Sequence, residues 1–137
     1  MAYLLDTNVV SEAASRNPDA KVMAWIEAHA VNCYVSCLTL GEIWRGIHGL
    51  PEGKRKSTLA AWAARLEHEV PQPLLPIDSA VLEIWGEIYA KNQTKGHELD
   101  ILDSLIAATA IRHELVVVTW NTADFPPEVR TINPWLG

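Results

Sequence analysis

Residues 101–119 place an alanine-rich apolar helix directly before a run of three consecutive valines. The valine run does not alternate with polar residues, which is typical of a strand buried on both faces of a parallel sheet. Short apolar runs of the same kind occur at residues 2–5, 34–37 and 131–132, and helical segments separate them. We therefore predict a three-layer α/β/α domain with a central, mostly parallel sheet.

The length and charge of the chain limit what it can be. It has 137 residues without a linker, repeat or low-complexity tract, so residues 1–137 are expected to form a single domain. A net charge of −6 excludes a general nucleic-acid-binding surface, so a nucleic-acid role requires a local basic patch or metal ions. No apolar run approaches the roughly 18 residues of a membrane span, and no signal-peptide pattern opens the chain.

The two cysteines, Cys33 and Cys37, fall on the predicted second strand. Their Cα atoms would lie about 13 Å apart there, which is beyond the reach of a disulfide. Two thiols without histidines at ligand spacing do not form a zinc site either. We expect both to be buried thiols in a reducing compartment, which indicates a cytoplasmic protein.

Several residues carry helix-start signals. Thr39 is expected to open the helix that contains Glu42, and Asp78 is expected to cap a later helix. A Trp-rich helix is expected to begin near Ser57, behind the basic run at residues 54–56. Tryptophans in or beside helical stripes are interpreted as core or interface residues rather than base-stacking platforms: Trp25, Trp44, Trp62 and Trp85.

Four acidic residues occupy positions that one α/β sheet would gather at a single edge. Asp6 follows the first strand, Glu42 lies in the helix after the second, Asp103 begins the helix before the third, and Asp124 follows that third strand. Ligand sites in such folds lie beyond the carboxyl ends of the strands. No Lys or Arg adjoins any of the four, so a divalent cation is the simplest counter-charge. Carboxylate oxygens favour Mg²⁺ or Mn²⁺.

Each acid also has a purely structural interpretation. Thr39-Leu40-Gly41-Glu42 fits a capping box, in which Glu42 only satisfies a helix start. The other acids have similar alternatives: an N-cap for Asp6, Asp100 or Asp103, and an Asx turn for Asp124. The joint placement of four acids beside apolar strands is what favours a site, because uncompensated charge is costly there.

Four segments of the chain, in this order, resemble the PIN-domain ribonucleases, in particular the VapC-type toxins of bacterial toxin–antitoxin pairs and their FitB-like subgroup. The segments are residues 4–12, 39–43, 103–110 and 118–125. The resemblance implies a PIN-like domain and carries the family's acidic residues onto Asp6, Glu42, Asp103 and Asp124. It also implies supporting polar residues, at Thr7, Asn8, Thr119 and Asn121. Trp120 departs from the pattern, because relatives often have Arg or Lys there, and this departure bears on phosphate contact and substrate choice.

The activity implied by the resemblance is metal-dependent cleavage of single-stranded or looped RNA, with Mg²⁺ or Mn²⁺ as the cofactor. Asp6 and Asp103 would be direct ligands, Glu42 would hold the ion or one of its waters, and Asp124 would complete or orient the shell. Thr7 and Asn121 would donate hydrogen bonds to the carboxylates or the phosphate. The implied partners are a small VapB-like or FitA-like antitoxin over the acidic groove, a second copy of the chain, and DNA only through the antitoxin.

Two rival functions remain open at this point. The first is a phosphotransfer domain with Asp6 as nucleophile, although a phosphatase of this type has a second Asp where this chain has Asn8. The second is a catalytically silent module that only binds a partner. Metal titration of the isolated chain would distinguish the silent module from an enzyme.

Overall fold

The computed structural model describes residues 1–136, which form a parallel four-stranded sheet flanked by helices on both faces. The strand order is β2-β1-β3-β4, and every pairing is parallel. The strands are β1 (Tyr3–Leu5), β2 (Cys33–Tyr34), β3 (Val116–Val118) and β4 (Thr131–Ile132). The helices are α1 (Thr7–Glu12), α2 (Ala20–His29), α3 (Cys37–His48), α4 (Lys54–Glu69), α5 (Ser79–Thr94) and α6 (Ile101–Arg112), with short 3-10 turns η1 (Ala30–Asn32), η2 (Thr122–Asp124) and η3 (Pro134–Leu136). The predicted fold class is confirmed.

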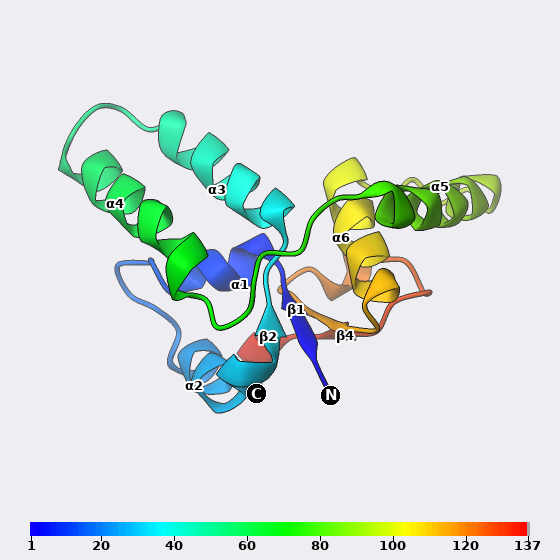
Figure 1. Ribbon diagram of the computed structural model, residues 1–137, viewed down its shortest axis with the longest axis horizontal. Helices are drawn as coiled ribbons and strands as arrows, with labels where there is room; N and C mark the ends of the chain where they lie inside the picture. Colours follow the sequence, from blue (N-terminus) through cyan, green and yellow to red (C-terminus); the bar gives the residue numbers. More distant parts are fainter. Residues whose placement is uncertain (137) are drawn as a thin grey trace.

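The two faces of the sheet bury two separate clusters of apolar side chains. Tyr3 and Leu5 of β1 join a cluster with residues of α1 to α4, whereas Leu4 points to the opposite face and packs with α5 and α6. The valines of β3 divide between the faces in the same way, as expected for the period of two along a strand. Figure 1 shows the pair α3 and α4 on one side of the view and α5 and α6 on the other.

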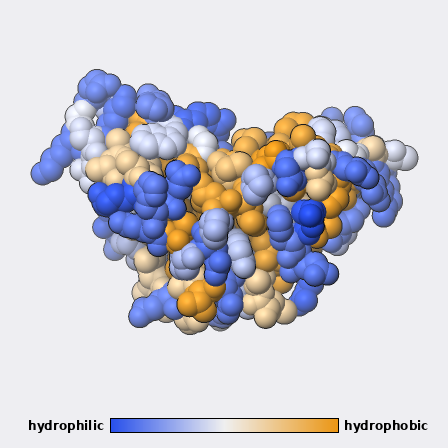
Figure 2. Space-filling model, viewed as in Figure 1, coloured by the Kyte–Doolittle hydropathy of each residue, from blue (hydrophilic) through white to orange (hydrophobic). Residues whose placement is uncertain are grey.

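The strand order places the parallel strands β1 and β3 side by side at the centre of the sheet. The chain continues from β1 to the outer strand β2 on one side, and from β3 to the outer strand β4 on the other. The backbone N–H of Asp6 continues the pairing by donating to the Val118 carbonyl over 2.9 Å. Both strands therefore end at the same edge, on the side of the helix pairs in Figure 1 and away from the two labelled chain ends. The space-filling view shows a hollow between the two groups of helices, with apolar atoms beneath it (Figure 2).

The start of α3 corrects three predictions. The helix begins at Cys37 rather than Thr39, because the Ser36 hydroxyl accepts the Leu38 backbone N–H at 3.0 Å and so serves as the cap. Strand β2 already ends at Tyr34, and Cys37 is exposed on the first helical turn instead of buried in the sheet. Glu42 therefore has no part in a capping box. Cys33 is buried, as expected.

Other helix starts agree more closely with expectation. Asp78 caps α5 and Asp100 caps α6, each through its own carboxylate. The helix that carries Trp62, α4, begins at Lys54, so the basic run forms its first turn and the expected start near Ser57 is wrong by one turn. Among residues 1–136, no helix has the length and apolar character that crossing a bilayer requires.

Candidate active site

Asp6 is the most enclosed acid of the candidate site, with only 4% of its surface exposed. One carboxylate oxygen accepts the Thr7 backbone N–H at 2.8 Å, so Asp6 also caps α1. The other accepts the Thr119 hydroxyl at 2.8 Å and the Asn8 side-chain amide at 3.2 Å. Burial raises the pKa of Asp6, and these hydrogen bonds oppose that effect because they favour the charged form.

Glu42 reaches the same edge of the sheet from the second turn of α3. Its carboxylate accepts the Thr7 hydroxyl at 2.6 Å, and the two residues come from segments 35 positions apart. The Thr7 hydroxyl also lies 3.4 Å from that of Thr39, which is fully buried beneath it. Because Thr7 directly follows Asp6, this contact ties α3 to the end of β1.

Asp103 lies in the first turn of α6, where Asp100 accepts its backbone N–H at 3.0 Å. Burial, together with the charges of neighbouring acids, raises the pKa of Asp103 from an ordinary 3.8 to about 7. After burial the causes are, in order, Asp6, Asp100, Asp124 and Glu42. The charges of the other three predicted acids, and that of Asp100, therefore all act on the Asp103 carboxyl group.

Asp124 is exposed at the end of η2, on the other wall of a cleft that it shares with Asp103. The cleft has a volume of about 640 Å³, and Asp100, Glu98 and the chain from Ala123 to Pro127 also line it. The segment leading to Asp124 is anchored at Thr119, whose hydroxyl oxygen accepts the Asn121 backbone N–H at 3.0 Å. Thr119 thereby fixes both Asp6 and the turn that carries Asp124.

Residues 3–126 match the family model of the PIN domain. The chain belongs to the PIN-domain family. All four segments that suggested this family lie within the match. The resemblance stated from sequence is therefore confirmed.

Curated relatives of this PIN domain cover nearly its full length. It is 36% identical to the toxin FitB of Neisseria gonorrhoeae, over 96% of this chain and 97% of that protein. It is also 36% identical to the VapC ribonuclease Y4jK of Sinorhizobium fredii, over 96% of both chains. A chain in the structure of FitAB bound to the IR36 DNA fragment superposes with a TM-score of 0.88 at 34% identity, covering 97% of this chain and 95% of that one.

The PIN fold places each supporting residue predicted from sequence near the acids, with one difference in role. Thr7, Asn8 and Thr119 hydrogen-bond to the acids through their side chains, as expected. Asn121 contributes through its backbone N–H. Two contributors were missed. Thr39 is predicted only to start a helix, whereas its buried hydroxyl lies next to that of Thr7. Asp100 is predicted to cap a helix, and it does so, but its charge also raises the pKa of Asp103.

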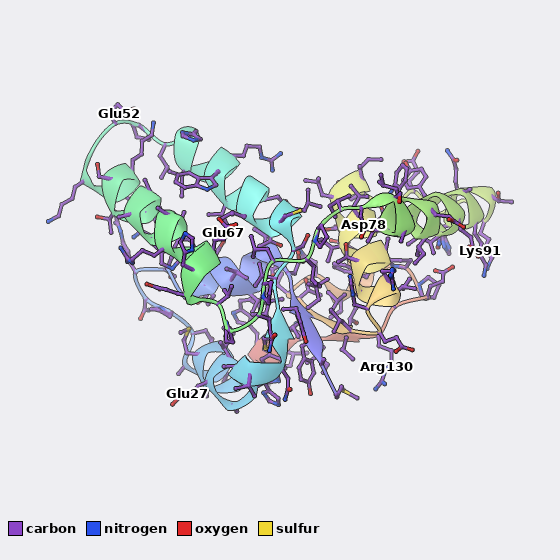
Figure 3. The ribbon with its side chains drawn as sticks, in the orientation of Figure 1. Glu27, Glu52, Glu67, Asp78, Lys91 and Arg130 are labelled. Atoms are coloured by element: carbon purple, nitrogen blue, oxygen red, sulfur yellow. The ribbon has the colours of Figure 1, made fainter. Side chains whose placement is uncertain are left out.

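The donor set of this site consists of carboxylates, which suits a hard divalent cation. In the described part of the chain, no three Asp, Glu, His or Cys side chains lie close enough together to hold one ion by themselves. Mg²⁺ is usually held by one or two carboxylates and several waters, so a shell partly made of water fits these residues. The ion pairs found in residues 1–136 lie elsewhere, at Lys56–Glu52, Arg65–Glu69 and Lys91–Glu128, and leave the acids without a basic partner. Figure 3 shows Glu52 and Lys91 at opposite ends of the molecule.

We expect Asp103→Asn to stabilise the metal-free protein at alkaline pH. Between about pH 4 and pH 7 the folded state holds a proton on Asp103 that the unfolded state releases, so the free energy of unfolding falls as pH rises through this window. Replacing the carboxylate by an amide removes that loss. Because Asp103 is only half-buried, solvent screening limits the gain to a melting-temperature increase of about 3 °C at pH 8.

The measurement is a thermal melt of both proteins at several pH values in a chelator. The difference should vanish near pH 4, where the parent carboxyl is protonated. An equal difference at pH 4 and pH 8 would contradict the assignment of the effect to ionised Asp103.

Proposed function

We propose that the chain is a metal-dependent endoribonuclease that acts as the toxin of a type II toxin–antitoxin pair. The observation that carries the proposal is the acid cluster itself: burial, together with the charges of Asp6, Asp124 and Glu42, raises the pKa of Asp103 to about 7, and none of these acids forms an ion pair within residues 1–136. The name of the Sinorhizobium fredii relative, a VapC ribonuclease, supports the choice of RNA as substrate.

The residues of the chain divide into ion-holding and orienting roles. Asp6 and Asp103 would hold Mg²⁺ or Mn²⁺, while Glu42 and Asp124 complete or orient its shell. A bound ion would supply Lewis-acid stabilisation of the phosphodiester and a water of lowered pKa. Thr119 and Asn8 fix the Asp6 carboxylate through one of its oxygens.

The surroundings of Asp6 argue against the phosphotransfer alternative. A phosphatase of this type has a second Asp two residues after the nucleophile, whereas this chain has Asn8, whose side-chain amide donates to the Asp6 carboxylate at 3.2 Å. Asn8 therefore holds Asp6 in place and has no carboxyl group to act as a general acid. Trapping of a phosphoaspartate at Asp6 would nevertheless revive that alternative.

A groove next to the acids supports an antitoxin partner. It has a volume of about 280 Å³ and runs from Thr7 and Glu42 between α3 and α4, with apolar walls and one guanidinium, that of Arg55. We propose that the C-terminal segment of a FitA-like or VapB-like antitoxin lies over this groove and the acids. DNA contact would come only through the antitoxin, consistent with the net charge of −6 of this chain and with the FitAB complex on DNA.

A second copy of the chain is the other proposed partner. Leu82 of α5 and Ile101 of α6 are exposed large apolar side chains on helices that pack against each other. We propose that these two exposed side chains take part in the contact of a homodimer. Light scattering at micromolar concentration that gives only the monomer mass would contradict it. Because its proposed substrate is RNA, we place the protein in the cytoplasm.

The proposed activity is tested by cleavage of single-stranded RNA in the presence of Mg²⁺ or Mn²⁺. We expect cleavage to stop when a chelator is added and to return when the cation is restored, because the acids repel the phosphate backbone without it. The same RNA annealed to its complement should be cut more slowly. Cleavage that persists in chelator would contradict metal dependence, whereas a chain that neither binds Mg²⁺ by calorimetry nor cleaves would be the silent module.

A further inference from the structure

Trp120 differs from the other tryptophans of the chain. Its side chain is 56% exposed, and it is the one aromatic among the exposed large hydrophobic residues of the described chain. The other five are partly buried against the two apolar clusters, as expected from sequence for four of them: Trp25, Trp44, Trp62, Trp85 and Trp135. Contact between an indole and water is unfavourable, so covering this exposed ring with a ligand would lower the free energy.

The backbone of Trp120 is fixed to the acid cluster. Its N–H donates to the Asn8 side-chain oxygen at 3.0 Å, and the amide of the same Asn8 side chain donates to the Asp6 carboxylate at 3.2 Å. On one side of it, Thr119 donates its hydroxyl to Asp6 at 2.8 Å. The Trp120 backbone is therefore two hydrogen bonds from the Asp6 carboxylate, at the edge of the sheet that carries the acids.

The ring of Trp120 is supported from one side and open on the other. It meets Trp135 in a T-shaped contact, with ring centroids 5.1 Å apart and planes at 85°. Such a contact uses at most one face of the Trp120 ring, so at least one face stays free. Trp135 packs against the core and restricts the motion of the Trp120 ring, so the Trp120 side chain loses less conformational entropy when a base stacks on it.

We propose that Trp120 is a base-stacking residue, which holds a nucleobase of single-stranded RNA next to the phosphate at the acids. This inference rests on the proposed function. Residues 116–127 contain no Lys or Arg to hold the RNA backbone, and Trp120 is their exposed aromatic side chain, so it offers a nucleotide a planar face in this segment. Stacking of this kind accepts any base, because each has a π face. It predicts a residue that strengthens substrate binding with little sequence preference.

The test compares Trp120→Leu, which keeps apolar bulk, with Trp120→Tyr, which keeps an aromatic face. On a short single-stranded oligoribonucleotide we expect Trp120→Leu to raise KM about tenfold with kcat close to that of the parent, and Trp120→Tyr to stay near the parent. Val31→Ala is the control, because Val31 is an exposed apolar residue of η1 that precedes β2, at the opposite end of the strands from the acids. Thermal melts check that each variant folds.

A second substrate series identifies the stacked base. An abasic site at one position next to the cleaved bond should reproduce the loss seen with Trp120→Leu, and should add nothing further in that variant. Unchanged KM in Trp120→Leu, or fully additive losses, would overturn the inference and leave the ring as a protein contact.

Binding of labelled RNA by fluorescence anisotropy separates this inference from the proposed function. If the unmodified protein binds RNA, loses affinity in Trp120→Leu and does not cleave RNA, base stacking is supported and the nuclease activity is contradicted. If cleavage requires Asp6 but the affinity for RNA is the same in Trp120→Leu, only base stacking is overturned. A parent that neither binds nor cleaves single-stranded RNA overturns both.

Discussion

Asp6→Asn is expected to remain folded and to lose RNA cleavage by more than about 100-fold. The substitution keeps the size of the side chain, and one oxygen can still accept the Thr7 backbone N–H that caps α1. The buried charge is removed, which relieves the desolvation that raises the pKa of Asp6. The ion-holding carboxylate at the centre of the sheet edge is lost at the same time. Initial rates of cleavage and a thermal melt measure the two effects.

Asp78→Asn is the matched control for this variant. Asp78 caps α5 by accepting the Val81 backbone N–H at 3.0 Å, a role that Asn performs about as well. It lies at the start of α5 (Figure 3), and its charge is not among those that raise the pKa of Asp103. This protein should keep the parent's rate and stability. A purified Asp6→Asn protein that cleaves RNA at the parent rate would show that the site is wrongly assigned.

Asp103→Ala and Asp100→Ala are expected to fail in different ways, although the two acids are one helical turn apart. Asp103 is half-buried and lies close enough to the other site acids for their charges to raise its pKa. Its loss should therefore abolish Mg²⁺ binding and cleavage. Asp100 is exposed and caps α6 through the Asp103 backbone N–H. Its loss should cost about 1 kcal/mol of stability and little activity. Magnesium titration by calorimetry, urea unfolding and parallel cleavage assays distinguish the two.

Asp100→Asn separates the cap of α6 from the charge beside Asp103. Asn caps a helix about as well as Asp, so this variant should recover the stability that Asp100→Ala loses. Loss of metal in Asp100→Asn with retention in Asp103→Ala would mean that the ion is held one turn earlier on α6 than we propose.

Sequence reasoning located the acids because each follows or precedes a strongly patterned apolar segment. The valine run before Thr119 and the apolar run before Asp6 both indicate parallel strands, and parallel strands end at one edge. Helix periodicity also predicts which of the two acids on α6 faces the sheet. Counted forward from Asp103, Ile106, Ala107 and Ala110 form one face of the helix, and all three are buried.

The incorrect predictions for α3 come from local sequence rules that do not account for tertiary contacts. Thr39 and Glu42 have capping-box spacing, but Ser36 caps α3, and both residues instead meet Thr7 of the neighbouring helix α1. No local rule distinguishes these outcomes. The open face of Trp120 is likewise set by a long-range contact with Trp135, which sequence spacing does not show.

Because β1 lies in the middle of the sheet and pairs with β3, the acid site can form only late in the synthesis of these residues. Asp6 and its partner Thr119 are 113 positions apart, and β3 is made long after β1 and β2. A nascent chain that stops before β3 carries Asp6 and Glu42 but has neither the neighbouring strand nor Asp124. Closing so long a loop is also slow. The four acids can therefore come together only after the chain has been made as far as residue 124.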